Sequence, residues 1–412
     1  MALTSIVPRD RTARALAAGL TVSSLGTGLY TSTSILFFVG GLGLSAARVG
    51  TVATVAALAG LVFLPAAGAL LDRIGTIRVA TVFLGAEAAA MVWLSCASSL
   101  ATFAVGTFVA ALAAQGSRVA RGVLTAQVAP PGERGTVRAQ LRSCANLGVA
   151  VGAGAAAGAV VALPATQLRW LFVVNAATFV VLGAVYVRGL GHLDAAPSRA
   201  DGVSVRRAGG PRIAWTDRRY VVVMAMNGIL GVQYAALTVG VPVLVSSRPD
   251  VPAWTVPATL VVNTAVVVVF QATLSARIRG VPAAGRAVLQ GGAVLALSSS
   301  TLGLGHLARS GTSVAVLVLV VAVVHSVGEI FQVAGAFDLS YDLADPAYTG
   351  SYQAVHAWTA GAGSALGPVI WSAATAATTW WAPGVGGAFL AAGATTWFLT
   401  RREGRSGAPS SG

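Results

Sequence analysis

The sequence predicts an all-α integral membrane protein with twelve transmembrane helices in two six-helix halves. Three observations support this fold class. Long apolar segments recur along the whole chain, charged residues make up only 10% of it, and arginines gather in alternate interhelical loops. A transmembrane helix needs about 20 predominantly apolar residues, and cytosolic loops carry an excess of basic residues.

The composition excludes an ordinary soluble protein. Of the 412 residues 56% are hydrophobic, and the mean hydropathy is +0.77; soluble proteins carry about 25% charged residues. The net charge of +14 comes from 27 basic residues, all of them arginine. In a soluble protein this charge would favour nucleic acid, but membrane topology accounts for it here, and we expect no nucleic-acid partner. Cys96 and Cys144 fall inside apolar segments and are interpreted as small core residues.

Twelve apolar segments can be separated, and each is interpreted as one membrane-spanning helix. The first is longer than the apolar region of a signal peptide, which has about 7–15 residues, so we interpret it as a retained helix. The segments lie at about 15–40, 48–71, 76–97, 101–125, 140–163, 169–188, 219–246, 254–276, 285–305, 312–335, 351–377 and 381–400.

One long hydrophilic stretch separates the first six segments from the last six. Its glycines and prolines are typical of a flexible linker. The chain is therefore divided into an N-terminal six-helix half at 1–188, a cytosolic linker at 189–218, a C-terminal six-helix half at 219–400 and a cytosolic tail at 401–412.

Arginine placement orients the chain. With the N-terminus in the cytosol, only Arg48, Arg169, Arg248 and Arg309 lie on the outer side, and the other 23 (27 − 4) lie in cytosolic loops, tails or helix ends. The loop expected between helices ten and eleven is an exception because it carries aspartates and no arginine, but acidic residues contribute little to orientation. These aspartates are Asp338, Asp342 and Asp345.

The second and third segments are joined by a short charged turn. Gly68 permits a close helix approach, Gly75 permits unusual backbone angles, and Asp72 can accept hydrogen bonds from a helix N-terminus, where the dipole favours an anion. Arg73 and Arg78 complete the motif. The charged side chains and the non-helical backbone of the turn need hydrogen bonds from water or protein groups, so the turn must lie at a membrane face.

This motif resembles the loop between the second and third helices of the major facilitator superfamily, a large family of secondary transporters. In that family the loop clamps the two halves in the outward-facing state, which implies that Asp72 meets the start of helix eleven. Ile77 stands where the family usually has Lys or Arg, and the counterpart in the second half, Ser275-Ala-Arg277-Ile278, has lost its acid. The alternative interpretation is an ordinary basic cytosolic loop.

Helix four carries a second match to this family. Arg118, Arg121 and Gly122 resemble the pattern Arg-x-x-Gln-Gly, with Arg121 in place of the glutamine. An arginine inside a membrane helix is costly and normally faces the protein interior or water, which favours a functional role for Arg118. Alternatively, both arginines extend to the cytosolic surface.

Small residues mark close packing in helices five and eleven. Family exporters often have Gly-x-x-x-Gly-Pro in helix five, where Gly148 and Gly152 fit but the proline is missing. Helix eleven has the full pattern in Gly363, Gly367 and Pro368. Because such spacing is common wherever membrane helices pack closely, we interpret these mainly as packing residues.

Polar residues within the predicted helices indicate where the transport pathway runs. In this superfamily helices one, four, seven and ten line the central cavity. Helix one carries polar residues on one face, at Ser23, Thr27, Tyr30 and Ser34. For any single Ser or Thr the alternative is a hydrogen bond to its own helix carbonyl. The predicted substrate cavity consists of Thr27, Tyr30, Ser34, Arg118, Asn146, Asn227, Gln233, Tyr234 and Gln332.

Two acidic residues lie within predicted helices and are candidates for proton coupling. Glu329 has His325 one turn away, and a buried carboxyl group can titrate near neutrality. Arg118 lies at a similar depth in helix four, so it could pair with Glu329 across the cavity. Glu87, in helix three, is a second candidate. The alternative for both acids is a structural hydrogen-bonded or ion-paired role.

Together these features predict a secondary active transporter working by alternating access, with proton-coupled efflux of amphiphilic small molecules as the preferred function. We expect no cofactor, with the proton gradient as energy source. The expected partners are the lipid bilayer, protons and a small-molecule substrate, and the expected state is a monomer. The sequence shows no P-loop, metal-ligand spacing or catalytic set, so an enzyme is not expected.

Two alternatives stay open. One is an importer or facilitator of a specific small metabolite, and the other is a transporter-like membrane sensor that signals through the linker. The all-arginine, alanine-rich composition favours a bacterial origin. We therefore expect a multi-pass protein of the bacterial cytoplasmic (inner) membrane with both termini in the cytosol.

Overall fold

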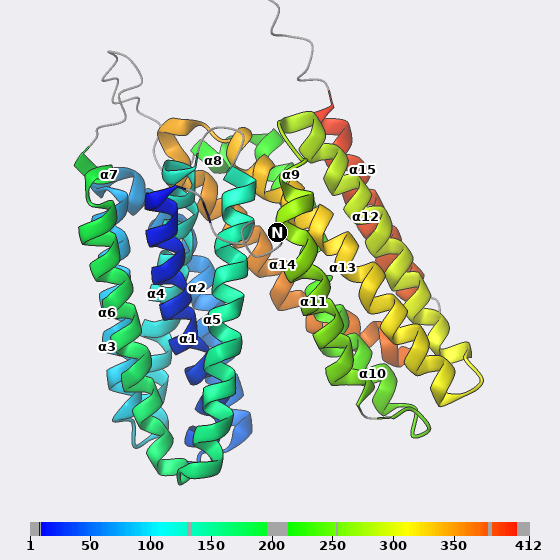
Figure 1. Cartoon of the computed structure of the whole chain (residues 1–412), viewed down its shortest axis with the longest axis horizontal. Coiled ribbons are helices and arrows are strands. Elements are labelled where there is room, and N and C mark those ends of the chain that lie inside the picture. The colour runs from blue at the N-terminus through cyan, green and yellow to red at the C-terminus, as the bar shows by residue number, and fades with distance from the viewer. Residues whose placement is uncertain are drawn as a thin grey trace, which may run out of the picture. The chain divides into compact units, whose positions relative to one another are not determined.

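The computed structural model describes residues 8, 10–129, 134–195, 213–252, 254–377 and 381–401, and every regular element within them is helical (Figure 1). Most of the predicted linker and nearly all of the predicted tail lie outside the described residues.

Twelve long helical segments occupy the predicted positions within the described part of the chain. They are α1 (Arg11–Ile35), α2 (Ala46–Ile74), α3 (Thr76–Ser95), α4 (Leu100–Val128), α5 (Arg134–Ala162), α6 (Arg169–Leu190), α9 (Arg218–Gly231) continued by α10 (Val241–Ser246), α11 (Thr255–Ser275), α12 (Val281–Gly303), α13 (Gly311–Asp342), α14 (Thr349–Ala377) and α15 (Trp381–Thr400). The short elements are η2 (Leu36–Gly41), η3 (Ala165–Leu168), α7 (His192–Ala195), α8 (Ile213–Thr216), η4 (Ala236–Gly240), η5 (Leu304–Leu307) and η6 (Pro346–Tyr348).

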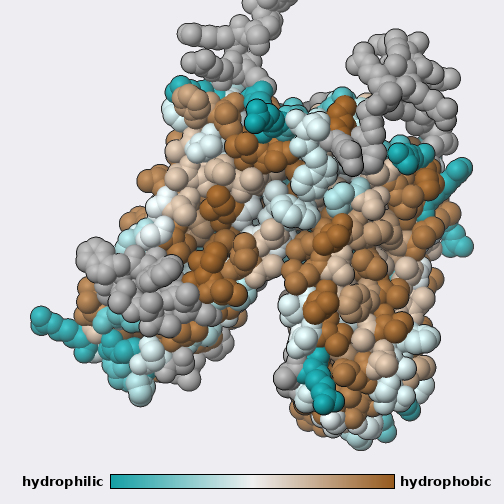
Figure 2. Space-filling model, turned by 180° about the vertical axis from the view of Figure 1, so that it is seen from behind, coloured by the Kyte–Doolittle hydropathy of each residue, from teal (hydrophilic) through white to brown (hydrophobic). Residues whose placement is uncertain are grey.

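Among the described residues eight helices are long and apolar enough to cross a membrane, and Ala258–Gln271 forms a shorter apolar stretch. Hydrophobic residues cover the long sides of each unit, while hydrophilic residues gather near the helix ends (Figure 2). This distribution is the one that a hydrocarbon environment requires.

Two helices extend well beyond their predicted ends. α5 begins at Arg134, and α13 runs on to Asp342. The placement of Asp338 and Asp342 in an interhelical loop was therefore wrong, because both lie in α13. Asp338 is only 7% exposed, whereas Asp342 at the end of the helix is exposed. Hydropathy alone underestimates the length of α13 because its last turns carry polar residues. Asp345 does lie in the connection, where its carboxylate accepts a hydrogen bond from the Ala347 backbone N–H at 2.9 Å.

Helix starts follow local capping chemistry. The Asp10 carboxylate accepts hydrogen bonds from the Thr12 and Ala13 backbone N–H groups at the start of α1, and these bonds hold the pKa of Asp10 below its usual range. Ser99 and Thr102 form a capping box at the start of α4. Gly75, with φ of 110°, separates α2 from α3, so this sharp turn depends on a residue without a side chain.

The chain divides into two compact units. The first comprises Met1–Pro130, Gln140–Ile213 and Asp345–Ala354, and the second comprises Pro131–Ala139, Ala214–Ala344 and Val355–Gly412. The first unit thus includes the start of α14, and the second includes the start of α5. The sequence gives no indication of this exchange of helix starts.

Each unit is a bundle of long helices (Figure 1). In the first unit α1 packs on α6, α2 packs on α4, and α3 packs on both α4 and α6. In the second unit α12 packs on α13 and α15, α11 packs on α13, and α9 packs on α15.

Glycines allow close helix approach in both units. In the first, a side chain on Gly148 of α5 would meet the carbonyl oxygen of Thr21 in α1. In the second, a side chain on Gly363 of α14 would meet the carbonyl oxygen of Gly228 in α9. One turn further along α5, Gly152 lies against Leu25 of α1. One turn further along α14, Gly367 lies against Ala235 of the seventh segment.

The seventh segment is interrupted. α9 ends at Gly231, and a π-helical stretch follows before α10. The indole N–H of the fully buried Trp371 donates a hydrogen bond to the Val232 carbonyl oxygen at 3.1 Å. The same carbonyl oxygen also accepts from the Ala235 backbone N–H at 3.2 Å, so α14 adds a second donor to it at the interruption.

Substituting Gly363 with Val should lower the melting temperature of the detergent-solubilised protein. The new side chain meets backbone atoms of Gly228, which cannot move aside cheaply. Overpacking of this kind costs about 1–3 kcal/mol, which for a chain of 412 residues corresponds to a drop of roughly 1–3 °C. Gly387→Ala is the matched control because a Cβ there meets no atom within 4 Å. Equal melting temperatures for both variants would contradict the packing role of Gly363.

Candidate functional site

The charged turn after α2 holds the first turn of α14 within the first unit. One oxygen of Asp72 accepts a hydrogen bond from the Gly350 backbone N–H at 2.7 Å. The other accepts from the Ser351 backbone N–H at 2.9 Å and from the Ser351 hydroxyl at 2.7 Å. The first N–H groups of a helix have no partner inside it, and the helix dipole favours an anion there. The family contact implied for Asp72 is therefore present.

Two glycines make this contact sterically possible. A Cβ on Gly68 would lie 2.6 Å from the Gly350 carbonyl oxygen, and a Cβ on Gly350 would lie 2.5 Å from the Asp72 carboxylate. The sequence analysis assigned close approach to Gly68 and no such role to Gly350. Arg73 and Arg78 are exposed beside the turn.

The start of α5 makes a contact of different chemistry within the second unit. The Arg138 guanidinium lies 4.3 Å from the ring centroid of Phe337 and 5.6 Å from that of Tyr341, both in α13. Its Nη1 atom also donates a hydrogen bond to the Tyr341 hydroxyl at 2.8 Å. The sequence analysis missed this contact, although two aromatic residues spaced by four in the helical part of α13 were a usable signal.

The helix-four motif and Glu87 form one polar cluster in the first unit. Glu87 is 8% exposed and accepts a hydrogen bond from the Ser117 hydroxyl in α4. The charges of Arg121 and Arg118 act on the Glu87 carboxylate. Glu87 and Arg118 are far apart in the sequence, and the packing of α3 on α4 brings Glu87 against the helix that carries Arg118.

Glu329 lies in a buried polar network of the second unit. It is 6% exposed, and its carboxylate accepts a hydrogen bond from Asn263 Nδ2 in α11 at 3.1 Å. Asn263 Nδ2 also donates to the Ser326 hydroxyl oxygen at 2.9 Å. The Ser326 hydroxyl itself donates to the Ala322 carbonyl at 2.7 Å, so toward Asn263 it can only accept, and this fixes the amide orientation of Asn263.

Asn263 was missed because α11 is otherwise a nearly continuous apolar run. His325 is buried, and its Nδ1 atom lies 3.4 Å from the Ser298 hydroxyl of α12. Arg118 and Glu329 lie in different units, so the pairing suggested for them stays a prediction.

Three amide side chains from the predicted cavity are buried in the second unit. Gln332 Nε2 donates a hydrogen bond to Asn227 Oδ1, joining α13 to α9. Gln233 is fully buried at the interruption of the seventh segment, and neither of its side-chain polar atoms has a partner among the described residues. Tyr234 beside it is 36% exposed. A buried amide without partners provides hydrogen-bonding capacity for a ligand or water.

The polar face of α1 is only partly available to a substrate. The Thr27 hydroxyl donates to the Ser23 carbonyl of its own helix at 3.0 Å, which is the alternative considered for such residues. The Tyr30 ring packs edge-on against Phe172 of α6 at a centroid distance of 5.0 Å. Ser34 is half-buried, and Asn146 of α5 is exposed.

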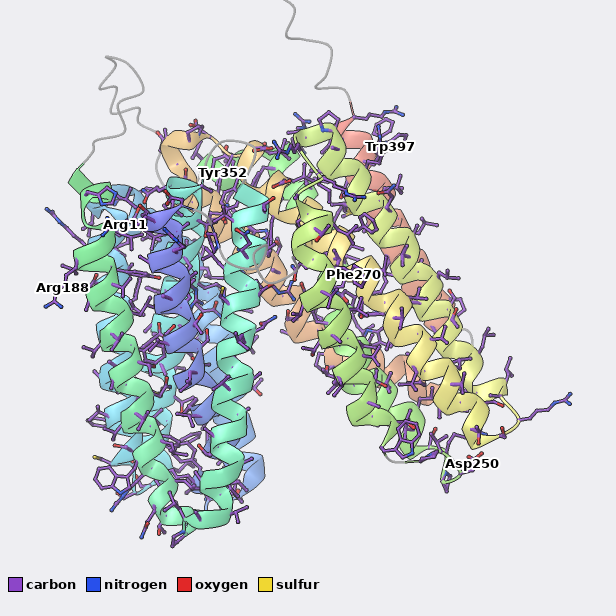
Figure 3. The ribbon with its side chains drawn as sticks, viewed as in Figure 1. Arg11, Arg188, Asp250, Phe270, Tyr352 and Trp397 are labelled. Atoms are coloured by element: carbon purple, nitrogen blue, oxygen red, sulfur yellow. The ribbon has the colours of Figure 1, made fainter. Side chains whose placement is uncertain are left out.

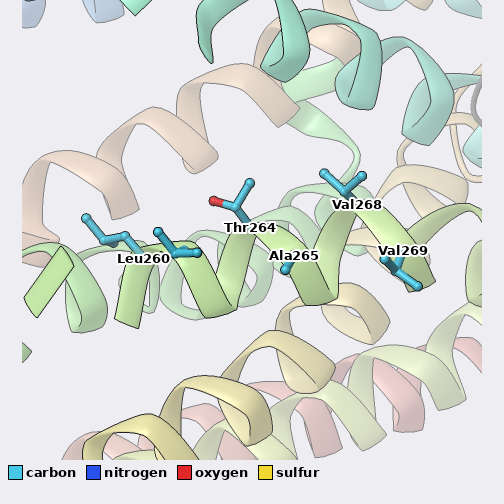
Figure 4. A pocket seen from close by; sticks show the side chains of 6 residues that line it. Leu260, Thr264, Ala265, Val268 and Val269 are labelled. Atoms are coloured by element: carbon cyan, nitrogen blue, oxygen red, sulfur yellow. The ribbon is translucent and has the colours of Figure 1, made fainter. Parts of the chain in front are cut away.

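An apolar groove of about 470 Å³ runs along α11 (Figure 4). Leu260, Thr264 and Val268 follow one another at helical spacing along it, and Ala265 and Val269 form its other edge. Thr264 supplies the only hydroxyl group of the lining. This surface suits the apolar part of a ligand.

The sequence matches the Major Facilitator Superfamily over residues 16–368. The chain belongs to this superfamily. Membership makes it a multi-pass membrane transporter rather than an enzyme, and it implies a bilayer and a small-molecule substrate. No match to a curated protein was found.

Solved structures of other superfamily members share the fold. A bacterial homologue of the iron transporter ferroportin, crystallised in an outward-facing state, is similar with a TM-score of 0.70 at 17% identity, over 95% of this chain and 98% of that chain. The E. coli fucose:proton symporter has a TM-score of 0.67 at 14% identity, covering 94% and 97%. The human organic anion transporter MFSD10 has a TM-score of 0.64 at 16% identity, covering 95% and 100%. At these identities the likeness shows the fold alone.

Variants at the contact between α5 and α13 should lose stability in a graded way. Arg138→Gln removes both the cation–π contact and the hydrogen bond, and Tyr341→Phe removes only the hydrogen bond. The cation–π contact contributes about 0.5–2 kcal/mol and the hydrogen bond about 1 kcal/mol. For a chain of 412 residues the melting temperatures of Arg138→Gln and Tyr341→Phe should therefore fall by roughly 3 °C and 1 °C. The exposed Arg279→Gln serves as control. A melting temperature for Arg138→Gln equal to that of the control would contradict the contact.

Proposed function

We propose that this superfamily member is a proton-coupled exporter of amphiphilic small molecules in the bacterial inner membrane, with both termini in the cytosol. The observation that carries the proposal is the membrane-buried carboxylate of Glu329, held by Asn263. An ionisable residue at such a position is costly and commonly serves a transported ion or proton.

In this proposal Glu329 takes up and releases the coupling proton. The Asn263 N–H group can donate to the carboxylate and also to the carbonyl oxygen of the protonated acid, so this bond survives a change of protonation. The charge of Glu329 also acts on His325. Protonation would therefore change local attractions without breaking the network, and it would bias the equilibrium between two conformations.

The substrate class follows from the second unit. The apolar groove on α11 offers a surface for hydrocarbon, and Gln233 and Tyr234 offer hydrogen-bonding groups at the interruption of the seventh segment. A ligand that uses both kinds of surface is amphiphilic. In the first unit, Glu87 with its arginines is a second candidate for proton uptake. The energy source is the proton gradient, no cofactor is needed, and a monomer suffices.

Import of a metabolite is the second candidate. The buried amides of Asn227, Gln233 and Gln332 favour it because a hydrogen-bonding metabolite needs such groups. One solved structure with a similar fold is a fucose:proton symporter. Accumulation of amphiphilic dyes and antibiotics in efflux-deficient cells distinguishes the two directions. Lower accumulation that a protonophore restores supports export, whereas unchanged or raised accumulation in expressing cells supports import or a narrower substrate.

Glu329→Gln should abolish the proton dependence of transport. Glutamine keeps an oxygen that can accept from Asn263 but cannot titrate. We expect energised transport to fall at least about tenfold, which corresponds to about 1.4 kcal/mol, and the protonophore to have no further effect. Asp250→Asn, at an exposed acid paired with Arg248, is the control. A pH profile that persists in Glu329→Gln would place the coupling residue elsewhere.

Asp72→Asn should impair transport while the protein is expressed at the normal level. The amide offers one acceptor oxygen where the carboxylate offers two, so a donor in the first turn of α14 loses its partner. We expect roughly a tenfold loss of transport rate. Ser351→Ala, which removes one of the three donors, should have a milder effect. Normal transport by Asp72→Asn would refute a conformational role for this contact.

A further inference from the structure

The first unit has an apolar groove of about 390 Å³ between α3 and α6. On α3 it is lined by Leu84 and Gly85, and on α6 by Val180, Gly183 and Val187, which the proposed function does not use. Its one hydroxyl group, that of Thr81, already donates to the Ile77 carbonyl at 2.7 Å. The groove therefore offers an apolar ligand surface with no unsatisfied hydroxyl.

Two facing glycines create the groove. A Cβ on Gly85 would meet no atom within 4 Å, and a Cβ on Gly183 would meet only the Thr81 methyl group at 3.9 Å. Neither glycine serves a tight helix contact, unlike Gly148 and Gly363. Val180 and Val187 beside them are 62% and 56% exposed, so a chain-like apolar ligand has access to the whole length.

An arginine ends the groove on one side only. Arg188 belongs to its lining and lies in the last turn of α6, where its side chain points away from the bundle (Figure 3). Along α6, Val180 and Arg188 are about 12 Å apart. The first turns of α1 lie at the same end of the unit, because Gly189 is close to Ala15, and Arg11 is exposed in the first of these turns.

We propose that this groove binds one anionic phospholipid, with an acyl chain between α3 and α6 and the phosphate group at Arg188. Charge complementarity selects this occupant, since an apolar groove that ends at an arginine matches a hydrocarbon chain that ends at a phosphate. Basic pockets between membrane helices on the cytosolic side bind such headgroups. The lipid site depends on the proposed membrane orientation, which places Arg188 at the cytosolic leaflet. It does not depend on the proposed transport mechanism.

The site can be tested by lipid retention on the purified full-length protein. Native mass spectrometry would compare phosphatidylglycerol with phosphatidylcholine of identical acyl chains, each added at the same concentration. We expect phosphatidylglycerol to be retained preferentially. Arg188→Gln should lower its retention about fivefold, which corresponds to about 1 kcal/mol, and should leave phosphatidylcholine unchanged.

A second variant tests the site independently of charge by filling the groove with a side chain. Gly85→Leu projects into open space, so it should fold normally and reduce retention of both lipids. Gly158→Leu, at a similarly open glycine of α5, and Arg169→Gln, at the opposite end of α6, are the controls and should change nothing.

Three results would overturn the site: equal retention of the two lipids by the unsubstituted protein, no effect of Arg188→Gln, or displacement of phosphatidylglycerol by a transported dye. The last result would make the groove part of the substrate pathway. Glu329→Gln and Asp72→Asn should retain the lipid normally, so a failure of the transport proposal can be distinguished from a failure of this one.

Discussion

Hydrocarbon around these helices offers no hydrogen bonds, so each buried polar group must find a partner within the protein. Most of the polar contacts described above follow from this constraint. The buried indole N–H of Trp371 donates to the Val232 carbonyl, the Ser117 hydroxyl donates to Glu87, and the Asn263 amide donates to Glu329. Gln233 is an informative exception, because both polar atoms of its buried amide lack a hydrogen-bond partner among the described residues.

The same constraint explains how glycine is used. In hydrocarbon the hydrophobic effect does not hold helices together, so close packing must. Gly148 and Gly363 bring a helix against a neighbouring backbone, whereas Gly85 and Gly183 leave an open surface. All four residues are glycines, and the distance of the neighbouring helix determines whether a glycine forms a close contact or leaves a groove.

The starts of α14 and α5 are held by opposite charges. An aspartate accepts hydrogen bonds from the first turn of α14, which suits the positive end of a helix dipole. At the start of α5 an arginine lies over two aromatic rings and donates to a phenol. The degraded second copy of the loop motif, without its acid, is consistent with this different chemistry. Each unit thus stabilises a helix start whose continuation belongs to the other unit.

Periodicity and hydropathy determined the twelve segments, the fold class and the family motif, because a membrane helix is specified by local composition. The contact of Asp72 could also be anticipated, since the family motif implies its partner. The partners of the other buried charges could not be predicted from local pattern. Glu329 and Asn263 are 66 residues apart in the chain, and Arg138 and Tyr341 are 203 apart.

Side-chain pairing over such separations depends on how helices rotate and pack, which hydropathy does not specify. The start of α5 and the end of α13 were missed for a related reason. Their helical turns are polar, and a polar segment is predicted as a loop when hydropathy is the only criterion. The sequence by itself determined which segments lie in the membrane. The tertiary structure alone decided which polar groups meet there, because the free energy of each buried charge depends on neighbours brought from distant parts of the chain.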